Sequence, residues 1–155
     1  MTAKSNRKGV VMPENNYDTD FYAWANEQAA LLRAGRLSSA DIANIAEEIE
    51  SMGRTEKREL VSRLTVLLTH LLKWKFQPNG RCSSWRTSIK VQRNRIVDHL
   101  RDNPSLQPQI PDAMEKAHRD AILEAAEETK LDESVFPPRC PWSFDEVIDA
   151  GFWPE

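Results

Sequence analysis

The pattern of apolar residues predicts a chain built from helices. Over residues 55–76, large apolar side chains recur three or four positions apart and form one broad stripe: Leu60, Leu64, Leu67, Leu68, Leu71 and Trp74. A helix of this length extends for about 33 Å, so its stripe must be covered by other helices. The sustained alternation of apolar and polar residues that indicates strands is not found. The sequence therefore predicts an all-α, irregular helical bundle organised around residues 55–76.

Start and stop signals predict the remaining helices. Gly35 and Gly53 are expected to end the first two helices, because glycine readily adopts the left-handed conformation of a helix C-terminus. Ser143 and Glu146 form a capping box that opens a short last helix. The five main helices are expected over residues 19–34, 39–52, 55–76, 84–102 and 111–130.

The length of the chain favours one domain. Residues 1–16 are polar and without periodicity, so a disordered leader is expected there, followed by a single helical domain over residues 17–155. Two cysteines are too few for a disulfide framework, and neither a secretory signal nor an apolar run of membrane length is present. A cytoplasmic protein that does not enter the membrane is therefore expected.

Charge is distributed unevenly along the chain. Residues 73–101 carry eight basic side chains against one acidic side chain, and residues 102–155 carry four basic against thirteen acidic ones. On the predicted helix 84–102, four cations share one stripe: Arg86, Lys90, Arg93 and Arg101. On the helix that follows, four carboxylates share another stripe: Asp120, Glu124, Glu127 and Glu128. The basic stripe either binds nucleic-acid phosphates or is neutralised by the acidic one, and matching registers in an antiparallel pair favour neutralisation.

A second candidate site combines residues from two predicted helices. Glu48, Arg63 and His70 border the apolar faces of consecutive helices, so they are expected to meet. Carboxylates and a histidine could bind a divalent metal, but no glutamate stands three residues before His70, as the di-metal bundle pattern requires. We therefore expect a hydrogen-bonded polar cluster, with neither a metal nor a cofactor.

Signatures of catalysis are missing from the sequence. It contains no glycine-rich phosphate loop, nucleophile elbow, CxxC or HExxH motif. Cys82, near the start of a basic helix, is the one conceivable nucleophile. One cysteine alone is weak evidence, so no catalytic residue is assigned and an enzyme is not favoured. Trp142 and Trp153, in the C-terminal segment, either pack on the core or mark a partner surface.

Several segments resemble a known family. They are YDTDFYAWANEQAALLRAGR, IAEEIESMGRTEKREL, LLTHLLKWKFQP, SSWRTSIKVQR, NPSLQP and CPWSFDEVID. Together they resemble the bacterial domain-of-unknown-function family numbered twenty-nine. The resemblance implies an all-helical cytoplasmic protein, mostly from cyanobacteria or proteobacteria, and it implies no activity or substrate.

The function best supported by the sequence is that of an interaction module for a protein partner whose identity stays open. Two alternatives remain. One is a nucleic-acid-binding protein that uses the basic helix 84–102, and the other is a metal-dependent or nucleophilic enzyme at the Glu48/His70 region. The sequence does not decide the oligomeric state.

Overall fold

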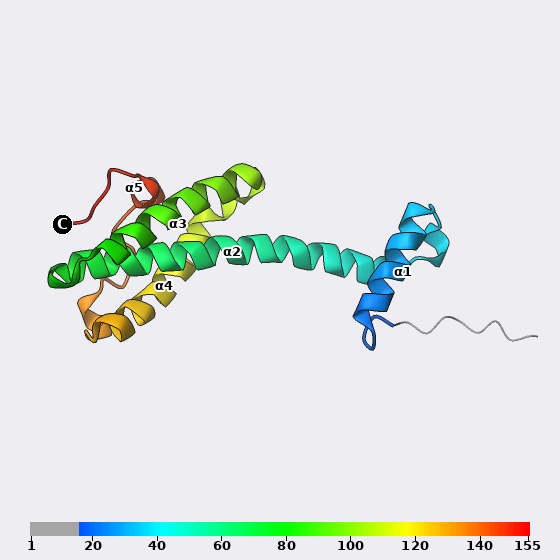
Figure 1. Ribbon diagram of the computed structural model, residues 1–155, viewed down its shortest axis with the longest axis horizontal. Coiled ribbons are helices and arrows are strands. Elements are labelled where there is room, and N and C mark those ends of the chain that lie inside the picture. The colour runs from blue at the N-terminus through cyan, green and yellow to red at the C-terminus, as the bar shows by residue number, and fades with distance from the viewer. Residues whose placement is uncertain (1–15) are drawn as a thin grey trace, which may run out of the picture. The chain divides into compact units, whose positions relative to one another are not determined.

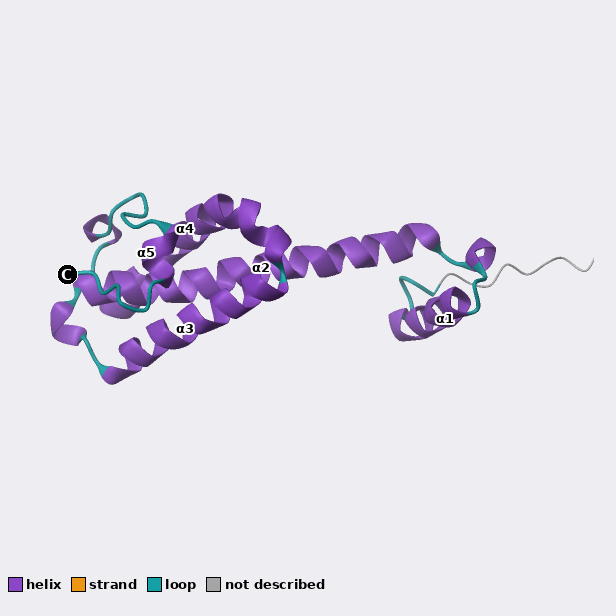
Figure 2. Cartoon of the chain, turned by 90° about the horizontal axis from the view of Figure 1, so that it is seen from above, coloured by secondary structure: helices purple, strands orange, loops and turns teal. Residues whose placement is uncertain are grey.

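The computed structural model describes residues 16–155 and confirms the all-α prediction, because no strand occurs in this range. Residues 1–15, which make up nearly all of the expected leader, lie outside the described residues. The helices, purple in Figure 2, are α1 (Phe21–Arg33), α2 (Ile42–Phe76), α3 (Ser83–Asp102), α4 (Ile110–Thr129) and α5 (Phe144–Ile148). Within residues 16–155, none of these helices is both long and apolar enough to cross a membrane.

The predicted break at Gly53 is wrong. Helix α2 runs without interruption from Ile42 to Phe76, so the second and third predicted helices are one. Gly35, with φ 69°, adopts the left-handed conformation after α1 as predicted, whereas Gly53 has no positive φ. A glycine inside a helix costs only about 1 kcal/mol relative to alanine, which the hydrogen-bonded turns on both sides of Gly53 outweigh.

Contacts divide the chain after Ser51 into two compact units. The N-terminal unit, residues 16–51, holds α1 and the start of α2. Its buried side chains are Trp24 and Gln28, and both are tied to Asp41. The Trp24 indole donates to the Asp41 carboxylate at 3.0 Å, and the Asp41 amide donates to Gln28 Oε1 at 2.7 Å. Polar contacts therefore contribute much of what joins α1 to α2.

The C-terminal unit, from Met52 to Glu155, is built on the rest of α2, with α3 and α4 beside it (Figures 1 and 2). Its core combines the predicted leucine stripe of α2 with small side chains of α4. The following residues in it have no exposed surface: Leu60, Leu64, Leu67, Leu68, Leu71, Leu72, Ile89, Ile96, Ala113, Ala117, Ala121 and Ala125. The small side chains on this alanine face of α4 let the helix approach the core closely.

Contacts between side chains fix the direction of each helix in this unit. Lys57 bonds to Asp112, Thr69 to Glu124 and Lys73 to Glu128, and each pair is 55 positions apart. A constant separation means that α2 and α4 run parallel. Helix α3 runs antiparallel to α2, because His99 near its end contacts Glu56, while Trp85 near its start contacts Lys73.

The C-terminal segment closes one end of this unit. Helix α5 begins with the predicted capping box, in which the Ser143 and Glu146 side chains each accept a bond from the other residue's amide. Trp142 is buried, and the ring centroid of Trp153 lies 4.8 Å from that of Trp74. These tryptophans therefore pack on the core, Trp142 buried and Trp153 partly buried.

Candidate functional site

The structure does not bring Glu48, Arg63 and His70 together, so the predicted polar cluster is wrong in its members. Each makes a different contact: Glu48 accepts from the Tyr17 hydroxyl at 2.6 Å, Arg63 pairs with Glu59, and His70 Nδ1 lies 2.7 Å from the Val66 carbonyl oxygen. The physical reason is the continuity of α2, because Glu48 and His70 lie on one helix and not on two helices that face each other.

A similar combination of side chains does form, at other positions. Glu56 and Glu59 on α2 and His99 on α3 place their ligand-type atoms within 4.8 Å of one another. His99 Nε2 lies 2.9 Å from the Glu56 carbonyl oxygen and 3.6 Å from its carboxylate, and the His99 side chain is only 9% exposed. The pairing of His99 with Glu56 depends on the register between α2 and α3, which helical periodicity does not specify.

The polar atoms of this Glu56/Glu59/His99 cluster are already engaged. A nitrogen that faces a carbonyl oxygen at hydrogen-bond distance must carry the proton, so His99 Nε2 donates to Glu56. The nitrogen that lies closest to the carboxylate therefore has no lone pair for a metal. Arg63 donates to the Glu59 carboxylate and neutralises its charge. The arrangement supports a hydrogen-bonded structural cluster better than a metal centre.

The predicted basic stripe does not act as one surface. Arg93 is only 3% exposed and donates to the carbonyl oxygens of Val147 at 2.9 Å and Phe152 at 2.6 Å. Burial lowers the pKa of Arg93, and the nearby Asp149 carboxylate opposes this shift. Arg93 therefore anchors the C-terminal segment and is not available to a nucleic acid.

The other three cations of the stripe differ from one another. Arg101 forms ion pairs with Asp98 and Asp102 next to it. Arg86 stacks over the Trp74 ring at 5.7 Å, and Lys90 has no ion-pair partner among residues 16–155. Two cations, not four, are left for an anionic partner on this face.

The predicted neutralisation of the basic stripe by α4 is also wrong. Glu128 pairs with Lys73 of α2, and Glu124 accepts from Thr69 of α2 at 3.3 Å. Asp120 pairs with Arg119 within α4, and Glu127 pairs with Lys130, the residue just after α4. The acidic edge of α4 thus follows α2 and not α3.

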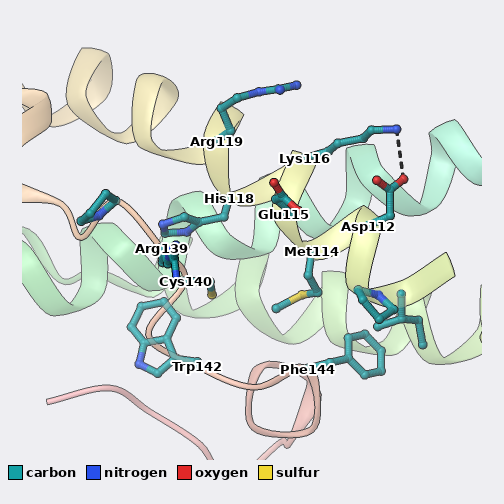
Figure 3. A pocket seen from close by; sticks show the side chains of 13 residues that line it. Asp112, Met114, Glu115, Lys116, His118, Arg119, Arg139, Cys140, Trp142 and Phe144 are labelled. Atoms are coloured by element: carbon teal, nitrogen blue, oxygen red, sulfur yellow. Dashed lines mark ion pairs between the residues drawn. The ribbon is translucent and has the colours of Figure 1, made fainter. Parts of the chain in front are cut away.

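A pocket of about 890 Å³ lies between the first half of α4 and the segment 138–144 (Figure 3). His118 and Trp142 line it, together with the Cys140 thiol. Burial raises the pKa of Cys140, which keeps the thiol protonated and disfavours it as a nucleophile. His118 Nε2 donates to the Pro137 carbonyl oxygen at 2.9 Å, so this histidine fastens the segment to α4. Cys82 is exposed at the start of α3.

The comparison with protein families gives one result. The family model described as "Domain of unknown function DUF29" matches residues 16–153. The chain belongs to the DUF29 family. No curated protein and no solved structure matches it.

The DUF29 match extends over both units and includes every helix from α1 to α5. The N-terminal unit is therefore as much a part of the DUF29 domain as the bundle that contains the core. The family description assigns no activity, so the match leaves function to the chemistry of the surface.

One surface that sequence analysis missed belongs to the N-terminal unit of this DUF29 chain. Six of its large apolar side chains are 41–80% exposed: Phe21, Tyr22, Leu32, Leu37, Ile42 and Ile49. Ile42 and Ile49 stand seven positions apart, a spacing typical of one apolar face of a helix. They are exposed because, at 100° per residue, they lie about a quarter-turn from Asp41, which contacts Trp24 of α1, and from Glu48, which contacts Tyr17 before α1. Periodicity alone does not show which side chains of this helix meet Trp24 and Tyr17.

Proposed function

We propose that this protein is a cytoplasmic interaction module whose N-terminal unit binds a basic, amphipathic helix of a protein partner. The observation that supports the proposal most strongly is the exposure of six large apolar side chains in a unit that buries one. The described part of the N-terminal unit, residues 16–51, buries only Trp24 among its large apolar side chains, which supports the idea that a partner covers the exposed ones.

The charge of the N-terminal unit supports the chemistry of the partner. Residues 16–51 contain seven acidic and two basic side chains, a net charge of −5. Two copies of this surface would repel each other, whereas a helix with apolar residues on one face and lysine or arginine beside them would match both features. Ile42 and Ile49 share one face of α2 and are placed to contact such a helix.

The test uses the full-length protein and a synthetic helix of leucine and lysine, about 18 residues or five turns long. Calorimetric titration is expected to show micromolar binding at physiological salt. A peptide with glutamate in place of lysine should bind far more weakly. The double variant Ile42→Asp/Ile49→Asp should lose at least about tenfold in affinity, since burying one isoleucine contributes roughly 1.5–3 kcal/mol.

A matched control comes from the C-terminal unit. Val97 and Leu123 are exposed to a similar degree, so the variant Val97→Asp/Leu123→Asp makes the same chemical change elsewhere. Equal loss of binding in both variants would contradict the proposal, as would a preference for the acidic peptide. Sedimentation velocity of the free protein tests whether a second copy of the chain covers this surface instead. A dimer that the Ile42→Asp/Ile49→Asp variant abolishes would replace the basic partner with a second copy.

A further inference from the structure

The pocket between α4 and the segment 138–144 contains a buried histidine with one unpaired nitrogen. His118 lines this pocket and is only 3% exposed. Its Nε2 donates to the Pro137 carbonyl oxygen, so the proton of the neutral ring lies on Nε2 and Nδ1 carries a lone pair. Among residues 16–155, this Nδ1 is buried and has no hydrogen-bond partner. A buried acceptor without a partner is unfavourable, so a ligand that donates a hydrogen bond to it gains an advantage.

The walls of the pocket favour a flat, apolar ligand. Met114, Trp142 and Phe144 line it together with His118 (Figure 3). Met114 and Trp142 are 8% and 9% exposed, so the surrounding structure holds both in place. An aromatic ring and a polarizable thioether each make favourable contacts with another aromatic ring. At about 890 Å³, the pocket has the size of a small-molecule site.

The charged side chains that line the pocket are exposed and balance one another. Lys116 pairs with Asp112, and Arg119 pairs with the carboxylate of the next residue. Glu115 and Arg139 have no ion-pair partner among the described residues, and they carry opposite charges. A ligand with a single net charge would therefore meet repulsion as well as attraction. This balance favours an uncharged ligand.

A metal ion is the other ligand that a histidine lone pair could bind. Cys140 lines the same pocket and could supply a second ligand atom. Within residues 16–155, however, neither His118 nor Cys140 belongs to a group of three His, Cys, Asp or Glu side chains close enough to hold one ion. The observations therefore favour a ligand that donates a hydrogen bond.

We propose that this pocket binds a small, uncharged aromatic molecule with an N–H group, of which indole is the simplest example. The ring packs on Trp142 and Met114, and its N–H group donates to His118 Nδ1. The site lies in the C-terminal unit and is separate from the apolar surface of the N-terminal unit that the proposed function uses.

The test compares indole with benzofuran, which has the same shape but an oxygen atom in place of the N–H group. Amide NMR of the full-length protein follows both titrations. Indole is expected to bind with a Kd of roughly 0.1–1 mM, as suits so small a ligand, and to shift the amides of residues 112–119 and 139–144. Benzofuran should bind at least about fivefold more weakly, because it cannot donate to Nδ1.

A pair of variants assigns this difference to one residue. His118→Phe keeps a flat ring and removes both nitrogens, so it should bind indole and benzofuran with equal affinity. The matched control His70→Phe makes the same change on α2, outside the pocket, and should keep the wild-type difference. If His118→Phe does not fold, because it loses the bond to Pro137, the comparison of the two ligands on the wild type decides alone.

Four results would overturn the proposal. The first is equal binding of indole and benzofuran to the wild type, and the second is a Kd for indole above about 10 mM. The third is a set of shifts confined to residues 16–51, which would place indole on the N-terminal unit. The fourth is binding of indole-3-acetate at least about tenfold tighter than that of indole, which would replace the uncharged ligand with an aromatic acid.

Discussion

Replacing Arg93 by alanine should loosen the C-terminal segment and destabilise the protein. Arg93 donates to the carbonyl oxygens of Val147 and Phe152, and its guanidinium lies 5.3 Å from the centre of the Trp153 ring. A hydrogen bond from a charged donor contributes about 1.5–3 kcal/mol, and a cation–π contact about 0.5–2 kcal/mol. Burial of the guanidinium opposes these terms. We expect a net loss of about 2–4 kcal/mol in the free energy of unfolding, or roughly 4–16 °C in Tm.

Three measurements separate this anchoring role from a general effect of removing charge. Arg95→Ala changes an exposed arginine two residues away on the same helix, and it should shift the free energy of unfolding by no more than about 0.5 kcal/mol. The free energy of unfolding of Arg93→Lys should fall between those of Arg93→Ala and Arg95→Ala, because one ammonium cannot bond both carbonyls as the planar guanidinium does. Amide hydrogen exchange over residues 144–153 should speed up in Arg93→Ala alone. Equal denaturation midpoints for Arg93→Ala and Arg95→Ala, with unchanged exchange, would refute the reasoning.

Three further predictions follow from single contacts. The hydrogen bond from Tyr17 to the Glu48 carboxylate raises the pKa of Tyr17 to about 12, so its contribution to stability is present below pH ~10 and is lost as the pH rises through 12. Absorbance titration of the phenolate should show that Tyr17 ionises at this raised pH, and Glu48→Gln should lower the pH at which it ionises. His99→Ala should cost about 1–3 kcal/mol by leaving its partners unpaired, and a chelator should leave the wild-type Tm unchanged. Glu128→Gln should cost about 1–3 kcal/mol in urea unfolding, because the Lys73 ammonium would remain buried without its counter-ion, whereas Lys73→Met should cost less.

The helices and the core were predictable from sequence because they depend on local signals. The leucine stripe of α2, the alanine face of α4 and the Ser143 capping box each require knowledge of one helix only. The continuity of α2 through Gly53 was not predictable from propensity, because the contacts on either side decide whether a glycine's cost of about 1 kcal/mol ends the helix. This single error also moved the candidate site, since it placed Glu48 and His70 on separate helices.

The candidate sites were harder to predict because they depend on the register between helices. The sequence suggested the right kind of combination, carboxylates on one helix with a histidine on another. The residues that meet are Glu56, Glu59 and His99, through an antiparallel alignment of α2 and α3 that periodicity does not specify. The parallel register of α2 and α4 is likewise not specified by periodicity. It brings Lys57 of α2 and Lys116 of α4 to the same carboxylate oxygen of Asp112.

The pairing of the acidic edge of α4 shows which physical term decides between two basic neighbours. By register alone, the acidic side chains of α4 could pair with the cations of α3 or with those of α2. Lys73 of α2 is almost fully buried, and a buried ammonium without a counter-ion costs far more than a solvated one. Arg86 and Lys90 of α3 remain close to water and need no carboxylate. The carboxylate of Glu128 therefore lies beside Lys73, where the loss of a counter-ion would be most costly. This cost arises from packing, because Lys73 is held beside the Trp85 ring of α3.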